Sequence, residues 1–218
     1  MTPSLQTTPL TDTDARRSWL KIAFALMAAT VLYNITEAVI ALYYGWLANS
    51  VALVGFGFDS LIEMSASGLV LFQLLIQLKW NNPTLIEKSE HWVHRFVGAT
   101  FFLLSAYILY EAIPALIYQE PPESSSMGIF LAILSLIIMP ALAWGKLKAA
   151  SHIKSAALRA EAKETIACTI LSFILLFGLG TNALFGWWWA DPIAGLLMLP
   201  WLIKEGLENI QGSDCCAD

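Results

Sequence analysis

The chain has 218 residues, of which 57% are hydrophobic and 13% charged, and its formal net charge is -5 at pH 7. Soluble domains carry roughly 25% charged residues, so this composition excludes a soluble globular protein and indicates an integral membrane protein in a lipid bilayer. The three cysteines, an odd number without wide spacing, indicate free thiols in a reducing compartment rather than a disulfide framework, and we expect no nucleic-acid partner.

Residues 1–18 are polar and include several Thr and Pro, so we expect a disordered cytoplasmic tail. Residues 19–205 hold six apolar segments, each near the roughly 20 residues that cross a bilayer. We predict an all-α membrane protein with one domain of six transmembrane helices, over about Leu20–Tyr44, Ser50–Leu78, His94–Tyr118, Met127–Leu147, Ile153–Leu179 and Leu184–Ile203. Residues 206–218 form a short cytoplasmic tail, and we expect no cytoplasmic domain.

The distribution of basic residues predicts the orientation of these helices. All 12 Lys and Arg lie near the N-terminus, in or beside the second and fourth connectors, or at the C-terminal end, and the connectors GWLAN, QEPPESSS and TNALFG have none. Basic residues concentrate on the cytoplasmic side of membrane proteins. Both termini are therefore expected to be cytoplasmic, in a bacterial inner membrane.

Asn34 and Glu37 lie one turn apart on the same face of the first predicted helix, in its outer half. Glu37 is a candidate for a residue that hydrogen-bonds to a buried metal-binding side chain, or for part of an exit path toward the outer face of the membrane. The alternative is a protonated acid bonded to a neighbouring helix.

Two acids, Asp59 and Glu63, lie inside the apolar second segment, SVALVGFGFDSLIE. Four residues make about one helical turn, so both side chains point the same way. A charged carboxylate inside a bilayer costs on the order of 2.5 kcal/mol or more, and a pair needs a cation, a proton or a hydrogen-bond donor between its members. The spacing therefore predicts a cation site.

The fifth segment repeats this spacing with Glu164 and Cys168. Both segments open with Ser-x-Ala-Leu, at Ser50 and Ser155, and in each the first acid of the pair follows nine residues after that serine. Because the two helices are predicted to be antiparallel, both pairs come to about the middle of the bilayer.

Together Asp59, Glu63, Glu164 and Cys168 form a predicted four-coordinate metal site. Carboxylates with a thiolate suit zinc or cadmium, whereas carboxylates alone suit harder ions such as manganese; iron and cobalt are further alternatives. The ion is cargo rather than a cofactor. Three acids and a thiolate exceed the charge of one dication, so metal release should be accompanied by proton uptake, which is the basis of antiport. The alternatives are protonated acids that bond to other helices, and a Cys168 that only fills the core.

Two further acids lie near the ends of the last two helices. Glu161 is expected to pair with Arg159 or Lys163 at the cytoplasmic mouth of the path. Asp191, just before Pro192, is expected to cap a helix, with a place on the metal path as the alternative.

Four residues on the cytoplasmic side are candidates for metal capture. His91 and His94 have a spacing that lets one helix offer two imidazoles to a metal, and Cys215 and Cys216 follow the last helix. The alternatives are a solvated turn at the interface for the histidines and a flexible tail for the cysteines.

With these residues in hand, the chain resembles the membrane domain of the cation diffusion facilitator family over roughly residues 20–205. The stretches NITEAV, SVALVGFGFDSLIE, AEAKET and WWWADP are similar to a compact bacterial branch related to vertebrate synaptic-vesicle zinc proteins. The resemblance implies a homodimeric, proton-coupled exporter of a zinc-type cation that works by alternating access.

Two features depart from the family pattern. Glu164 and Cys168 stand where better-known members place His and Asp, and the chain ends soon after the sixth helix, so a dimer would form through the helices, with Gly98 as a candidate contact. The alternative function is a metal-binding subunit or sensor that does not transport and modulates a partner. We expect no enzyme, because the sequence has no HExxH, GxSxG or Cys-x-x-Cys motif.

Overall fold

The computed structural model describes the backbone of residues 10–79, 83–119 and 122–211, and within these ranges it contains helices and no strand. The helices are α1 (Leu10–Ala48), α2 (Val51–Lys79), α3 (Pro83–Tyr118), α4 (Ser126–Ile153), α5 (Ala156–Phe185) and α6 (Ala190–Gln211). This confirms the predicted all-α class, with one helix for each apolar segment. Helices α1 to α5 are long and apolar enough to cross a membrane, and the 22-residue α6 packs beside α3 and α5.

The helix ends differ from the predicted ones at several places. Helix α1 begins at Leu10, so residues 10–18, expected to belong to a disordered tail, continue the first helix. Helix α6 likewise extends to Gln211. A helix already formed gains one hydrogen bond for each residue added, so polar flanking residues can extend a membrane helix beyond its apolar stretch.

The repeated Ser-x-Ala-Leu motif has a structural cause, because each serine caps a helix. The Ser50 hydroxyl accepts a hydrogen bond from the Leu53 N–H at 3.1 Å, and the Ser155 hydroxyl accepts one from the Leu158 N–H at 3.2 Å. A serine at this position satisfies a backbone donor that the first turn of a helix leaves free. The motif therefore sets where α2 and α5, which carry the two predicted ligand pairs, begin.

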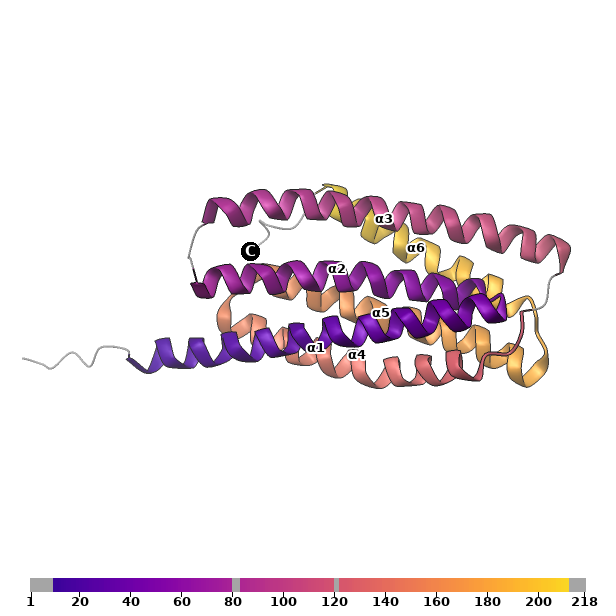
Figure 1. The fold of residues 1–218 in the computed structure, drawn as a ribbon, viewed down its shortest axis with the longest axis horizontal. Coiled ribbons are helices and arrows are strands. Elements are labelled where there is room, and N and C mark those ends of the chain that lie inside the picture. Colours follow the sequence, from indigo (N-terminus) through magenta and orange to yellow (C-terminus); the bar gives the residue numbers. More distant parts are fainter. Residues whose placement is uncertain (1–9, 80–82, 120–121, 212–218) are drawn as a thin grey trace, which may run out of the picture.

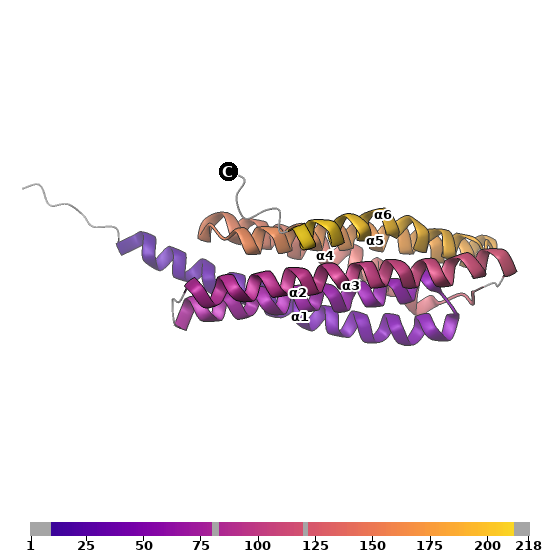
Figure 2. The same ribbon diagram turned by 90° about the horizontal axis from the view of Figure 1, so that it is seen from above.

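The six helices form two layers of three. Figure 1 shows α3 and α6 along one edge, α2 and α5 in the middle, and α1 and α4 along the other edge. The perpendicular view in Figure 2 separates the layer α1, α2, α3 from the layer α4, α5, α6. Contacts join α1 to α4, α2 to α5 and α3 to α6. The central helices α2 and α5 thus face each other across the layers.

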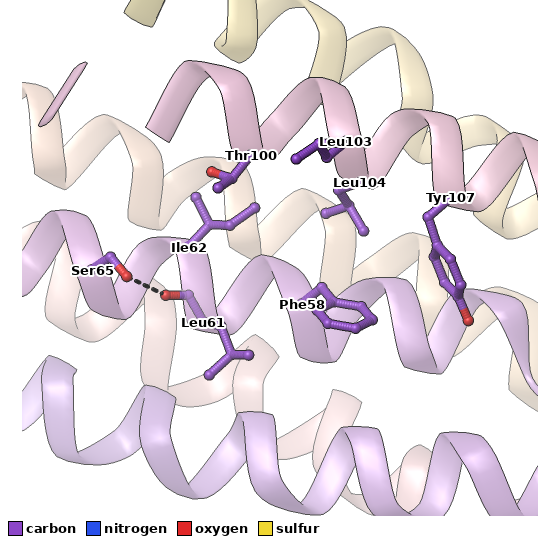
Figure 3. Close-up of a pocket in the computed structure, with 8 residues that line it drawn as sticks. All are labelled: Phe58, Leu61, Ile62, Ser65, Thr100, Leu103, Leu104 and Tyr107. Atoms are coloured by element: carbon purple, nitrogen blue, oxygen red, sulfur yellow. Dashed lines mark hydrogen bonds between the residues drawn. The ribbon is translucent and has the colours of Figure 1, made fainter. Parts of the chain in front are cut away.

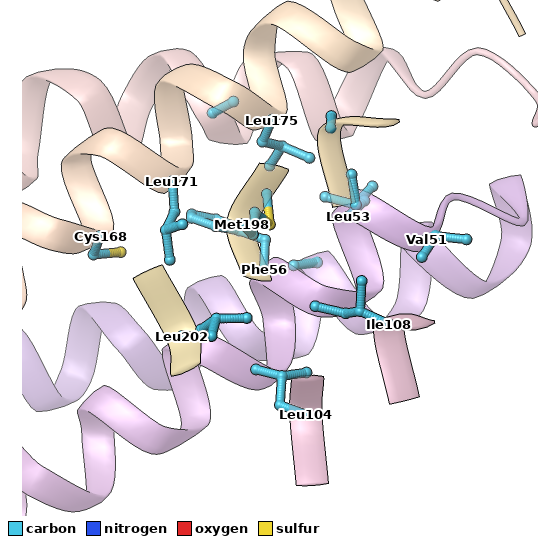
Figure 4. Packing of buried hydrophobic residues seen from close by; sticks show 14 of the residues in the cluster. Val51, Leu53, Phe56, Leu104, Ile108, Cys168, Leu171, Leu175, Met198 and Leu202 are labelled. Atoms are coloured by element: carbon cyan, nitrogen blue, oxygen red, sulfur yellow. The ribbon is translucent and has the colours of Figure 1, made fainter. Parts of the chain in front are cut away.

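An apolar core fills the space between the two layers. Figure 4 shows Leu53 and Phe56 of α2 packed with Leu171 and Leu175 of α5 and with Met198 of α6, all of them buried. This packing holds the central helices in register.

Gly98 lies within the chain's own helix packing rather than on a free surface. A Cβ atom at this position would lie 2.6 Å from the Cγ1 of Ile210 and 2.9 Å from the carbonyl oxygen of Gly206, both in α6. The glycine therefore lets α3 and α6 approach closely. This corrects the expectation that Gly98 marks a surface for a second copy of the chain.

Candidate metal site

The four predicted ligands line a single small pocket in the bundle. Asp59 and Glu63 come from α2, and Glu164 and Cys168 come from α5. The remaining lining residues are Phe101 of α3, Ala167 of α5, and Trp201 and Glu205 of α6. The cavity measures about 10 Å³ for a water-sized sphere, which is near the room that one water molecule needs.

The walls of this pocket leave polar atoms without partners. Oε2 of Glu63 and Nε1 of Trp201 are buried and have no hydrogen-bond partner in the described protein. Such atoms are costly to bury, and each needs an explanation such as an ion or a water molecule. The pocket therefore has the size and the free acceptor that a small cation requires.

The four predicted ligand side chains that line the pocket do not form a metal coordination shell in this structure. Within the part of the chain that the structure describes, no three His, Cys, Asp or Glu side chains converge closely enough to hold one metal ion. Cys168 lines the pocket together with Asp59 and Glu63, and it also belongs to the apolar core (Figure 4). Shared coordination by all four residues stays a prediction, and so does the alternative that Cys168 only fills the core.

A buried hydrogen-bond network adjoins Glu63 on the α4 side. The Thr165 hydroxyl donates to Oε1 of Glu63 at 2.8 Å and accepts from Nζ of Lys146 at 2.7 Å. Lys146 also forms an ion pair with Glu161 at 2.8 Å, and the Ser67 hydroxyl donates to the same Glu161 oxygen. The network joins α2, α4 and α5.

This network corrects the prediction for Glu161. Its partner is Lys146 of α4 rather than Arg159 or Lys163. Arg159 and Lys163 are exposed, whereas Glu161 is 3% exposed. At the helical spacing of 3.6 residues per turn, residues two positions apart point to different sides, so neither basic neighbour can reach the buried side with Glu161.

Lys146 is the residue that sequence reasoning missed. It lies in the run WGKLK at the end of the fourth apolar segment, where a lysine is typical of a membrane interface. Two residues further on, Lys148 is exposed and lies over the rings of Trp19 and Trp144, as such a residue should. No local signal distinguishes the two lysines, because the difference depends on the helices that cover α4.

Glu37 and Asn34 are both buried in α1. Glu37 accepts hydrogen bonds from the Tyr33 hydroxyl at 2.8 Å and from the Ser60 hydroxyl of α2 at 3.0 Å. Because α1 and α2 are antiparallel, this contact brings Asn34 to the level of Glu63. Both polar atoms of the Asn34 amide are buried and have no hydrogen-bond partner within the ranges that the structure describes. Their roles as ligand partners or on the path stay predictions.

Asp191 caps a helix, but not its own. Its Oδ2 accepts the Val51 N–H at 2.8 Å, and its Oδ1 accepts a hydrogen bond from the Ser50 hydroxyl. Asp191 is fully buried in the first turn of α6, and it holds the N-terminus of α2. The carboxylate also suits the positive end of the α2 dipole. Asp191 does not line the pocket.

The structure leaves the four metal-capture candidates untested. His91 and His94 lie on α3, but their side chains are outside the described part. Cys215 and Cys216 lie outside the described residues altogether.

A second, larger hollow lies between α2 and α3 and has a different character. Its volume is about 400 Å³, and Figure 3 shows its lining of Phe58, Leu61, Ile62, Ser65, Thr100, Leu103, Leu104 and Tyr107. The Ser65 hydroxyl donates to the Leu61 carbonyl oxygen at 2.9 Å, so it is already satisfied within α2. This mostly apolar hollow offers no carboxylate or thiol to a metal ion.

Comparisons with known proteins give independent information. Residues 27–212 match the family described as the cation efflux transmembrane domain. The chain is 27% identical over 205 residues to a "Cadmium, cobalt and zinc/H(+)-K(+) antiporter" of Bacillus subtilis, covering 88% of this chain and 60% of the relative. It is 28% identical over 200 residues to a protein of the same name from Bacillus velezensis, covering 86% and 58%.

A more distant relative is a cation-efflux pump of Shewanella oneidensis, which is 20% identical over 200 residues, covering 91% of this chain and 67% of the pump. The chain thus spans about three-fifths of the length of the two Bacillus relatives.

Proposed function

Because the chain belongs to the cation efflux family by its transmembrane domain, we propose that it carries a divalent metal cation across the membrane in exchange for protons. It is a multi-pass membrane protein. The observation that carries the proposal is that Asp59 and Glu63 of α2 line the same pocket as Glu164 and Cys168 of α5. These are the predicted ligands, and they come from the central helices of the two layers.

Zinc is the proposed cargo, with cadmium, cobalt, iron and manganese as alternatives. A thiolate beside carboxylates favours a borderline-soft dication over a hard one. The two Bacillus relatives carry cadmium, cobalt and zinc in their names. Replacement of Cys168 by Ser should therefore weaken cadmium binding more than manganese binding.

Proton coupling follows from the charge of the empty site. Without a metal, several acids would lie together in a pocket near the middle of the bundle, where uncompensated charge is costly. Acids and thiols must be deprotonated to bind a metal ion, so we expect them to take up protons when the metal ion leaves. The name of the two Bacillus relatives includes the words H(+)-K(+) antiporter, so it names protons together with potassium ions.

Alternating access is the proposed mode of movement. The ligand pairs belong to different layers, so a shift of one layer against the other would open the pocket toward one side of the membrane at a time. We further propose a homodimer in a bacterial inner membrane, with both termini cytoplasmic. The basic residues at one end of the bundle support this orientation.

The test uses purified full-length protein in liposomes with a pH gradient and a zinc-sensitive dye inside. We expect zinc flux in the wild type and its loss in Asp59→Asn and Glu164→Gln. Glu208→Gln is the matched control, because Glu208 is an exposed acid of α6, and it should keep wild-type flux. Wild-type flux in both site variants would remove the proposal. Zinc binding without flux in the wild type would favour the metal-binding subunit instead.

A further inference from the structure

Lys146 places a positive charge inside the bundle, beside the candidate metal site. Its side chain is 0% exposed, and among the described residues it is the only buried Lys, Arg or His. It has two partners on α5, namely Glu161 at 2.8 Å and the Thr165 hydroxyl at 2.7 Å. A buried cation of this kind is costly unless its partners compensate it.

The second partner links Lys146 to a predicted metal ligand. The Thr165 hydroxyl accepts from Lys146 and donates to Oε1 of Glu63 at 2.8 Å. In such a chain each hydrogen bond polarises the next, so the ammonium strengthens the bond that Glu63 receives. The other oxygen of Glu63 has no hydrogen-bond partner among the described residues. Glu63 therefore has the Lys146 ammonium on one side, reached through Thr165, and the pocket on the other.

A metal ion bound at Glu63 would share this carboxylate with Lys146. Two cations near one carboxylate repel each other, and the repulsion is stronger in a protein interior than in water. Lysine suits a variable role, since its ammonium is a compact charge on a flexible four-carbon stem. A metal and Lys146 therefore compete for the negative charge of Glu63.

We propose that Lys146 is the built-in counter-cation of the metal site. In the metal-free protein it compensates Glu63 through Thr165, and in the loaded protein it weakens the hold of Glu63 on the metal. Lys146 is thus a positioning residue that promotes metal release and the return of the empty carrier. The inference rests on the proposed function, because it assigns a partner to the same site.

Replacing Lys146 should tighten metal binding and slow turnover. The experiment measures zinc affinity of the purified full-length protein by competition with a chromogenic chelator, for Lys146→Met and Lys146→Gln. The Gln variant keeps a hydrogen-bond donor for Glu161 and Thr165. We expect both variants to bind zinc about tenfold more tightly than the wild type. In liposomes, KM and the maximal rate should fall together, whereas damage to the fold would lower the rate without tightening binding.

Lys148→Met is the matched control, since it removes the same charge from the same helix at an exposed position. It should leave zinc affinity unchanged. Unchanged or weaker zinc affinity in the two Lys146 variants would overturn the inference about Lys146. The proposed function would still stand in that case, provided that the wild-type protein transports zinc. Loss of folding in both variants would also overturn it, because Lys146 would then serve the fold. A wild-type protein that binds no zinc would remove the proposed function itself.

Discussion

Nζ of Lys146 in α4 lies 2.8 Å from Oε1 of Glu161 in α5, and the two side chains are 0% and 2% exposed. The pair sits next to the pocket that the two acids of α2 share with Glu164 and Cys168. A buried pair of this kind contributes little net stability compared with apolar residues, but loss of one partner leaves an uncompensated charge. The pair can therefore affect both the stability of the fold and metal binding at the adjacent site, and the two effects are measured separately.

The first prediction concerns stability. Glu161→Ala should lower the free energy of unfolding by about 3–5 kcal/mol, because it leaves Lys146 buried without its counter-charge. The double variant Lys146→Met with Glu161→Leu should recover much of this loss. Thermal unfolding in detergent measures both. Lys204→Ala breaks an exposed pair with Glu208 and serves as the control, with an expected change of about 0–1 kcal/mol. A double variant as unstable as the single one would contradict the prediction.

A second prediction concerns the structural role of Asp191. Asp191→Ala should lower stability by about 1–2 kcal/mol, because the Val51 N–H and the Ser50 hydroxyl lose their acceptors at the start of α2. Zinc affinity should stay at the wild-type value, since Asp191 does not line the pocket. Thermal unfolding and chelator competition on the same sample measure the two effects. Lost zinc affinity at unchanged stability would place Asp191 on the metal path instead.

Asn34 permits a test that separates a binding role from a structural one. Its two amide atoms are buried without hydrogen-bond partners in the described part of the chain, so Asn34→Leu removes an unsatisfied group and should not reduce thermal stability. If the amide contacts the cation or its ligands at the level of Glu63, the same variant should bind zinc several-fold more weakly. Wild-type zinc affinity would show that the amide takes no part in binding. Ala38→Val, a change at another buried position of α1, is the control for altered packing.

The pH dependence of metal binding tests proton coupling. Zinc binding should release protons, because acids that hold protons in the empty site must lose them to coordinate the ion. Affinity should therefore fall as the pH falls. Calorimetric titrations in buffers with different ionisation enthalpies count the released protons, and Asp59→Asn should reduce the count. Equal heats in all buffers would contradict proton exchange at this site.

The number of helices is predictable from local signals, but the expected start of the fifth helix at Ile153 is wrong, because α4 extends to Ile153 and α5 begins at Ala156. Runs of about 20 apolar residues indicate membrane helices. Ser50 and Ser155 mark helix starts because a serine hydroxyl caps the backbone of its own next residues. The start of α1 at Leu10 was not predicted, because a polar segment can be either a tail or an extension of a helix.

The partners of the buried polar residues were predicted less well. Asp191 does cap a helix, as expected, but the helix is α2, and this contact joins residues 140 positions apart in the chain. Gly98 contacts α6, which only the packing of α3 against α6 reveals. Contacts of this range depend on which helices become neighbours, and hydropathy carries no information on that choice.

The sequence by itself determined the six helices and the paired spacing of Asp59 with Glu63 and of Glu164 with Cys168, because helix length and side-chain direction follow from local periodicity. Only the tertiary structure decided that both pairs line one pocket and that Lys146, unlike Lys148, points inward to Glu161. The physical reason is that burial is a property of the assembled layers: the same lysine is solvated on a free helix and enclosed once the helices packed against α4, which are α1 and α5, cover it.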